Sequence, residues 1–185
     1  MRYDIAENTL ETERLLLRPF RLEDAEAVAV FCDSEPVYRR TLNLPHPYTA
    51  DCARRWIGGH AENFRSGRFY EYAVTGREDG CLYGCVGLSH DAAHHNGELG
   101  YWFGEPHWGR GYATEAAAAL IDFAFSVKDY HRVYAGHFAG NPASGRVMQK
   151  CGMRFEGIQR EHVCKDGAYV DVVCYAILKQ EWRGV

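Results

Sequence analysis

The chain has 185 residues, of which 46% are hydrophobic and 25% are charged, and its formal net charge is −4. This length suits one globular domain with a full core, so we expect a single domain over residues 1–185. The negative charge disfavours a protein that binds nucleic acid by electrostatic attraction. No hydrophobic run reaches the length of a membrane span, and the polar residues 1–11 do not resemble a signal peptide. We therefore expect no nucleic-acid or membrane partner.

The seven cysteines are odd in number and scattered, and no two have the spacing Cys-x-x-Cys. This pattern is typical of free thiols in a reducing compartment, so we expect a cytoplasmic protein. His90, His94 and His95 lie close to Asp91 in the sequence, but their spacing is not that of a helical zinc site. We expect no metal.

Hydrophobic periodicity and turn residues predict the elements in chain order. The first half is predicted to hold a strand over 14–18, helices over 22–32 and 49–66, and strands over 70–75 and 82–89 around a turn at 78–80. The second half is predicted to hold a strand over 98–103, an alanine-rich helix over 112–128, a strand over 132–138, a short helix from Asn141, and strands over 154–163 and 169–178. Asn141 followed by Pro142 is a favourable helix start. This mixture predicts an α/β fold of the mixed α+β kind, with six or seven strands and helices on both faces of the sheet.

The stretch 107–116 (HWGRGYATEA) joins the strand at 98–103 to the alanine-rich helix. Gly109, Gly111 and Ala113 carry little or no side chain, so a ligand can approach the main chain closely. The first turn of the helix offers unpaired N–H groups and the positive end of the helix dipole. These features predict a site for a phosphate or pyrophosphate. The alternative is a tight turn that binds nothing.

Two other nucleotide-binding turns do not fit this stretch. A P-loop needs Lys and then Ser or Thr directly after its second glycine, whereas Tyr112 and Ala113 follow Gly111. A Rossmann turn needs Gly or Ala where this chain has Thr114.

The segment 108–113 resembles the pyrophosphate-binding signature Gln/Arg-x-x-Gly-x-Gly/Ala of the GNAT superfamily of acyl-CoA N-acyltransferases. The tryptophan in first place and the sequence Ala-Thr-Glu-Ala are similar to the RimJ/RimL branch of ribosomal-protein N-acetyltransferases. The resemblance runs from about residue 11 to the C-terminus and includes segments 11–20, 141–153 and 165–177. It implies the GNAT fold, with a mixed, mostly antiparallel central sheet, and acetyl-CoA as co-substrate. The residues that the resemblance places at the cofactor are Tyr101, Trp102, Phe103, Trp108, Gly109, Arg110, Gly111, Tyr112, Ala113, Thr114, Asn141 and Ser144.

Acetyl transfer to an amine requires a proton acceptor, because amines are largely protonated at neutral pH. The resemblance implies that the pantetheine arm pairs with the strand at 98–103, where a backbone N–H polarises the thioester. Glu98 lies in that strand and is the candidate base, with a pKa that burial can raise. The alternatives are a carboxylate without a role, proton relay by a histidine of the 90–95 loop, and a water molecule.

Ser144 is the second catalytic candidate, as proton donor to the departing thiolate. Many relatives carry a tyrosine for this task where this chain has Met148, which cannot donate a proton. The alternatives are a water, no acid at all, and a local hydrogen bond from Ser144 to the first helical turn. Asn141 is expected to serve both as N-cap and as cofactor contact.

The resemblance implies an acetyl-CoA-dependent N-acetyltransferase that works by direct attack of a primary amine, without a covalent enzyme intermediate. The implied acceptor is the α-amino group of a protein or peptide. The alternatives are a small amine, such as a polyamine, an amino acid or an aminoglycoside, and a non-catalytic acyl-CoA-sensing module on the same fold. We expect a monomer or a homodimer. The aromatic residues expected to line both the core and the acceptor cleft are Trp56, Phe64, Phe69, Tyr70 and Tyr72.

Overall fold

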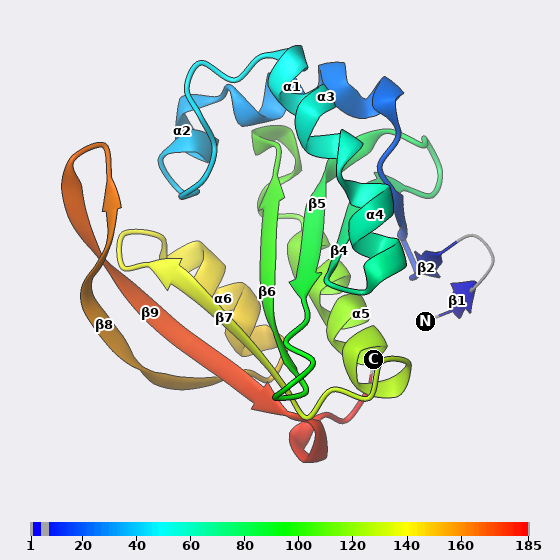
Figure 1. Cartoon of the computed structure of the whole chain (residues 1–185), viewed down its shortest axis with the longest axis vertical. Coiled ribbons are helices and arrows are strands. Elements are labelled where there is room, and N and C mark those ends of the chain that lie inside the picture. Colours follow the sequence, from blue (N-terminus) through cyan, green and yellow to red (C-terminus); the bar gives the residue numbers. More distant parts are fainter. Residues whose placement is uncertain (1, 5–7, 185) are drawn as a thin grey trace.

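The computed structural model describes residues 2–4 and 8–184, so residues 1, 5–7 and 185 of the predicted domain lie outside the described part. The described residues form a nine-stranded sheet in the order β1-β2-β3-β4-β5-β6-β7-β9-β8. Neighbouring strands are antiparallel except β6 and β7, which are parallel (Figure 1). The strands are β1 (Arg2–Asp4), β2 (Thr9–Glu11), β3 (Leu15–Pro19), β4 (Phe69–Gly76), β5 (Leu82–Ser89), β6 (Asn96–Phe103), β7 (Arg132–Phe138), β8 (Arg154–Lys165) and β9 (Ala168–Leu178).

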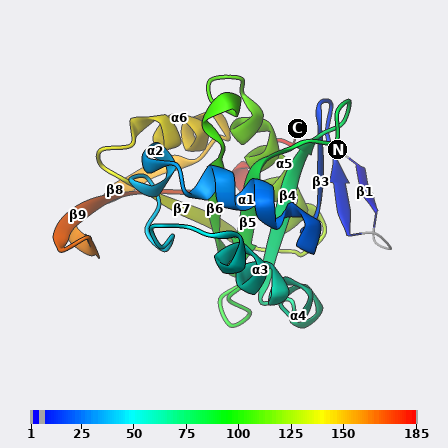
Figure 2. The same ribbon diagram turned by 90° about the horizontal axis from the view of Figure 1, so that it is seen from above.

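Helices cover both faces of the sheet, with α5 and α6 on one side and α3 and α4 on the other (Figure 2). No helix among the described residues combines the length and the hydrophobicity that crossing a membrane requires. The α-helices are α1 (Ala25–Cys32), α2 (Glu35–Tyr38), α3 (Ala50–Gly58), α4 (His60–Ser66), α5 (Tyr112–Ser126) and α6 (Pro142–Lys150), and short 3-10 helices span Leu22–Asp24, Glu105–His107 and Lys179–Glu181.

Side chains alternate between the two faces along the central strands, so each face has its own core. On β4, Tyr70, Tyr72 and Val74 belong to the core that contains α5. Ala73, between them, belongs to the core formed with α1 and α3. The many alanines of α5 are buried, and their small side chains let the helix lie close to the sheet. The start of α5 is thereby held firmly beside β6.

The mostly antiparallel sheet with helices on both faces confirms the predicted fold class. The sheet has more strands than the six or seven predicted, because β1 and β2 are too short to show a periodic pattern. The predicted helix over 49–66 is two helices, which meet at the Gly58–Gly59 pair, since adjacent glycines weaken a helix. Thr49 caps the first of them, as the Cys52 N–H donates to its Oγ1 at 3.3 Å.

An ion pair orients α1, which packs against α3 on the same face of the sheet. The Arg18 guanidinium donates to both carboxylate oxygens of Asp24, at 2.8 and 2.7 Å, and the Arg21 N–H donates to Asp24 Oδ2 at 2.8 Å. Burial alone would raise the pKa of Asp24, but the hydrogen bonds from Arg18 and Arg21 outweigh it and hold the pKa below its ordinary value of 3.8.

Replacing Asp24 with Asn should lower the free energy of unfolding by about 2 kcal/mol at neutral pH, because Arg18 loses a charged partner in a largely buried site. Since folding lowers the pKa of Asp24, its contribution is full above the unfolded pKa and is lost as pH falls through the lowered folded value. Urea denaturation should therefore show a deficit that is constant near neutral pH and shrinks below about pH 4. Asp51→Asn, in an exposed pair with Arg54, is the matched control and should cost under about 0.5 kcal/mol. A deficit for Asp24→Asn that does not change with pH would contradict this role of the charge.

Candidate active site

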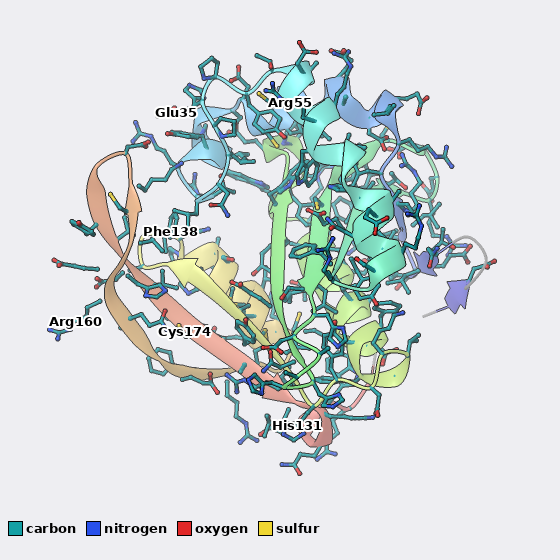
Figure 3. The ribbon with its side chains drawn as sticks, viewed as in Figure 1. Glu35, Arg55, His131, Phe138, Arg160 and Cys174 are labelled. Carbon is teal, nitrogen blue, oxygen red and sulfur yellow. The ribbon has the colours of Figure 1, made fainter. Side chains whose placement is uncertain are left out.

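The parallel pairing of β6 and β7 covers only Asn96–Glu98 and Arg132–Tyr134, and beyond these residues the two strands diverge (Figure 1). Figure 3 shows His131 where the strands start together and Phe138 at the far end of β7, well away from β6. A cavity of about 850 Å³ is lined by residues of both strands and of the surrounding helices. This divergence makes the cavity the candidate active site.

The backbone of β6 presents free hydrogen-bonding groups to this gap. The Glu98 N–H donates to Ser89 Oγ at 2.7 Å, on the β5 side of the strand. Because backbone groups alternate in direction along a strand, the N–H and C=O groups of Leu99 and Tyr101 face the gap. An extended ligand can therefore add to this edge as another strand would.

The predicted cofactor residues come from three separate elements, and the fold brings nearly all of them to one cavity. Arg110 is the exception, since its side chain does not line the cavity. The predicted residues that do line it are Glu98, Tyr101, Trp102, Phe103, Trp108, Gly109, Gly111, Tyr112, Ala113, Thr114, Asn141 and Ser144.

The turn before α5 has the geometry of an anion cradle. Gly109 and Gly111 have φ values of 73° and 83°, in the left-handed region that favours glycine. A Cβ on Gly109 would meet no atom within 4 Å, so the space above this turn is open. The α5 helix begins directly after Gly111, and its first N–H groups lie at the positive end of the helix dipole. The turn therefore suits the pyrophosphate of coenzyme A.

Arg14, just before β3, braces this turn, a role that sequence reasoning missed. Its Nε donates to Glu115 Oε2 at 2.7 Å and its Nη1 donates to the Arg110 C=O at 3.1 Å. Its guanidinium also lies 4.8 Å from the centroid of the Tyr112 ring. Hydrogen bonds from Thr12 and Arg14 outweigh burial and lower the pKa of Glu115, so its carboxylate stays charged. Arg14 and Glu115 both lie in segments that resemble the family, which was the available signal.

Trp108, the unusual first residue of the signature, ties the turn to the end of β6. Its Nε1 donates to the Phe103 C=O at 2.7 Å, and the Arg40 guanidinium lies 5.0 Å from the centroid of its ring. The Phe103 C=O would otherwise face the gap, and the hydrogen bond from Trp108 satisfies it.

Asn141 stands at the N-cap position of α6, but its side chain makes no capping hydrogen bond. The expectation that it caps the helix through its side chain is therefore wrong. The Asn141 backbone has φ −118° and ψ 66°, and its N–H donates to the Phe138 C=O at 2.7 Å. Its amide lines the cavity and is left for a ligand.

Ser144 and Tyr101 form a hydrogen-bonded pair on the α6 side of β6. Ser144 Oγ donates to Tyr101 Oη at 2.8 Å, and Tyr101 Oη donates to the Ser144 C=O at 2.9 Å. Burial raises the pKa of Tyr101, so the phenol keeps its proton. Met148, where relatives carry a tyrosine, is buried. The Tyr101 hydroxyl thus comes from strand β6, whereas Met148 lies on helix α6. Sequence reasoning did not consider Tyr101 as the acid.

Glu98 lies on the opposite face of β6, opposite Tyr134 in the strand register. Its carboxylate lines the cavity and makes no ion pair within the described part of the chain. Water reaches it through the cavity, yet the surrounding protein displaces enough solvent to raise its pKa. The alternative base His90 does not line the cavity, because its ring stacks on Tyr130 with the centroids 4.7 Å apart.

The structure shows which of the predicted aromatic residues line the cavity and which belong to the core, a division that the sequence left open. Trp56 and Phe69 line the cavity, whereas Phe64, Tyr70 and Tyr72 pack together in the core under α5. The described residues hold no group of three His, Cys, Asp or Glu side chains arranged for a metal ion. The polar side chains that line the cavity include carboxylates, hydroxyls and the Asn141 amide, together with the cations Arg40, Arg55, Arg146 and Lys150.

The family model for the acetyltransferase (GNAT) domain matches residues 14–154. This chain belongs to the GNAT family. It is 32% identical over 179 residues to YnaD of Bacillus subtilis (strain 168), an uncharacterized N-acetyltransferase, with 94% of this chain and 99% of YnaD covered. It is 24% identical over 187 residues to the [ribosomal protein uS5]-alanine N-acetyltransferase of Escherichia coli (strain K12), with 98% and 96% covered. The structure of Mycobacterium smegmatis RimJ in complex with CoA-disulfide matches with a TM-score of 0.82 at 25% identity, covering 90% of this chain and 83% of RimJ.

The GNAT protein described here is therefore an N-acetyltransferase, and its relatives include enzymes of the RimJ-like ribosomal-protein branch. The CoA complex of RimJ supports acetyl-CoA as its co-substrate.

Acetyl-CoA at ~100 times its dissociation constant should stabilise the GNAT enzyme by roughly 2.7 kcal/mol. Gly111→Val should abolish this gain, because valine is strained at the positive φ of this position and its Cβ would lie 3.4 Å from Arg14 Nη2, which braces the turn. Thermal unfolding with and without acetyl-CoA measures the effect. Gly80→Val is the matched control, since Gly80 has φ 66° in a turn outside the cavity. Both variants should lose stability through backbone strain, but only Gly111→Val should lose the response to acetyl-CoA. If acetyl-CoA stabilised Gly111→Val as much as the wild-type enzyme, the pyrophosphate would bind outside this turn.

If the Tyr101–Ser144 pair returns a proton to the thiolate, Tyr101→Phe and Ser144→Ala should each lower kcat by about 10²-fold, the low end for acid catalysis. The KM for acetyl-CoA should change little. The double variant should be no slower than either single variant, because the two hydroxyls act as one unit. Tyr175→Phe, which removes a hydroxyl bonded to Gln149 of α6 outside the cavity, is the control. Losses that appear only in KM would reassign the pair to cofactor binding.

Proposed function

We propose that this enzyme transfers the acetyl group of acetyl-CoA to the α-amino group of a protein or peptide, by direct attack and without a covalent enzyme intermediate. The observation that carries the proposal is the position of Glu98. Its carboxylate stands where β6 leaves β7, next to backbone groups that face the gap, and it lines the same cavity as the anion cradle.

The residues present fit acetyl-CoA from its anionic end to its reactive end. The N–H groups at the start of α5 and the open turn at Gly109 receive the pyrophosphate, and the free edge at Leu99 and Tyr101 pairs with the pantetheine arm. Bound there, acetyl-CoA supplies an acetyl thioester. A gap-facing N–H of β6 is placed to donate to the oxygen that becomes negative during attack.

Glu98 removes the proton that keeps the acceptor amine unreactive. An α-amino group has a pKa of about 7.7–8.0 and is largely charged at neutral pH. Because burial raises the pKa of Glu98, its carboxylate is a stronger base than an ordinary glutamate while remaining able to ionise. Cys151, the thiol near the helix end, is not a rival nucleophile, because burial raises its pKa to about 12.

The choice of a protein or peptide amine is supported by the relatives that act on ribosomal proteins, of which the Escherichia coli enzyme is named for the uS5 alanine. A panel of acceptors separates the alternatives. It contains short peptides with free N-termini, the same peptides with blocked N-termini and a lysine, and small amines. The proposal expects acetylation of free N-termini at a kcat/KM above that of every small amine in the panel. Higher values for polyamines, amino acids or aminoglycosides would replace it with small-amine acetylation.

Glu98→Gln keeps the shape of the side chain and removes its basicity. We expect kcat at neutral pH to fall by about 10²–10⁴-fold, with acetyl-CoA affinity unchanged. The deficit should shrink as pH rises, because the free amine then becomes abundant without a base. In the wild-type enzyme, activity should fall as pH drops through the raised pKa of Glu98, since only the ionised carboxylate accepts a proton.

The matched control is Glu105→Gln, because Glu105 lies just after β6 and does not line the cavity. This variant should retain wild-type turnover. A Glu98→Gln enzyme with nearly wild-type activity between about pH 6 and 9 would make Glu98 structural and assign proton removal to a water molecule.

A further inference from the structure

A second carboxylate, Glu71 of β4, lines the same cavity as Glu98. In the strand register Glu71 lies opposite Gly87 of β5, and Gly87 lies opposite Gly100 of β6. Both glycines line the cavity, and a Cβ on Gly100 would meet no atom within 4 Å. Since Glu98 and Gly100 are separated by one residue, they share a face of β6. Gly100 therefore leaves open space beside Glu98, whereas the Phe69 ring covers Gly87 beside Glu71, 2.9 Å from the place of a Cβ on Gly87.

Two indole rings line the cavity near Glu71. Trp56 Nε1 donates to Glu71 Oε1 at 3.1 Å, which fixes the carboxylate. The ring centroids of Trp56 and Trp102 lie 6.3 Å apart, and both residues line the cavity. Aromatic faces attract organic cations through the ring quadrupole. Aromatic rings beside a fixed carboxylate are typical of a site that binds an organic cation.

Glu71 has no counter-charge in the described part of the chain. Its side chain is only 13% exposed, and His60 is the one basic group there within ion-pair distance, with Nε2 3.0 Å from Glu71 Oε2. Burial lowers the His60 pKa to about 4. The ring is therefore neutral at neutral pH and cannot balance the carboxylate.

Arg55 also lines the cavity, from the α3 side (Figure 3). Its side chain is exposed and its Nη2 contacts Cys52 Sγ at 3.5 Å rather than Glu71. Holding a carboxylate largely away from water without a cation costs free energy. Burial accordingly raises the pKa of Glu71, although hydrogen bonds from Trp56 and Asn63 partly offset this effect. A ligand that brings a positive charge into the cavity removes this cost.

We propose that Glu71 binds a second positive charge of the acceptor, so that the enzyme selects amines that carry another cationic group. The inference rests on the proposed function, because Glu98 must face the amine that is acetylated. Two strand spacings across the sheet and two residues along β6 separate Glu71 from Glu98, so their backbone positions lie roughly 12 Å apart. Two cationic groups held between the carboxylates span about this distance or slightly less. A diamine supplies such a pair, and so does a peptide N-terminus followed closely by a lysine or arginine side chain.

The test compares acceptors that differ only in the second charge: 1,7-diaminoheptane against heptylamine, and the peptide Ser-Lys-Ala against Ser-norleucine-Ala. In the wild-type enzyme kcat/KM should favour the dication of each pair. Glu71→Gln keeps an oxygen for Trp56 Nε1 but removes the charge, and it should reduce this preference by about 30-fold, mainly through KM. Glu62→Gln, on the exposed side of α4, is the matched control and should keep the preference. Which of the two pairs shows the larger preference identifies the source of the dication.

An equal preference in the wild-type and Glu71→Gln enzymes would overturn the proposal and leave Glu71 as a tie between α3 and β4. If no amine is acetylated, the proposed function fails, and thermal stabilisation of the CoA-loaded protein by diamine against monoamine still decides the role of Glu71. If Glu71→Gln does not fold, Glu71→Asp is the second variant. It keeps the negative charge on a side chain that is one methylene shorter, so the preferred diamine should become about one methylene longer. An unchanged preferred length in that variant would also overturn the proposal.

Discussion

Strands β6 and β7 part after Glu98 and Tyr134, and the backbone groups of Leu99 and Tyr101 lose the partners that a continuous sheet would supply. Backbone groups in a protein interior need hydrogen bonds, so this edge suits an extended ligand that would complete the sheet. The gap is not a frayed end, because each strand is held on its other edge. β5 pairs with β6 as far as Phe103, and β9 pairs with β7 along the whole of Arg132–Phe138.

The pleat of β6 then separates the chemistry onto two faces. Glu98 and Tyr101 come from one short strand, but their side chains point to opposite sides of the sheet. Tyr101 meets Ser144 on the α6 side, whereas Glu98 shares its face with Trp102, which packs toward α3. In the proposed reaction the amine loses its proton on one face and the thiolate regains one on the other. Two groups that would hydrogen-bond to each other in contact are thereby kept apart.

The anion cradle depends on a contact that closes over a long stretch of chain. Glycines let the turn approach a ligand closely but also leave it flexible before binding. The Arg14 guanidinium joins the Arg110 C=O to the Glu115 carboxylate, so the turn and the first turn of α5 are attached to the start of β3. A braced turn loses less conformational entropy when a ligand binds, which favours affinity.

The sequence by itself determined the mixed sheet, the glycine turn before an alanine-rich helix and the family, because periodicity, turn residues and signatures are local patterns. It placed Glu98 and the cofactor residues in one strand, in the glycine turn after it and at the start of a short helix from Asn141, and the fold brings nearly all of them to one cavity. Only the tertiary structure decided that the Asn141 side chain does not cap its helix, that Tyr101 meets Ser144, and that Glu71 and Glu98 line one cavity. These contacts depend on strand register and on helices packing from opposite faces, and side chains 43 residues apart, as Tyr101 and Ser144 are, meet only when the whole sheet has formed.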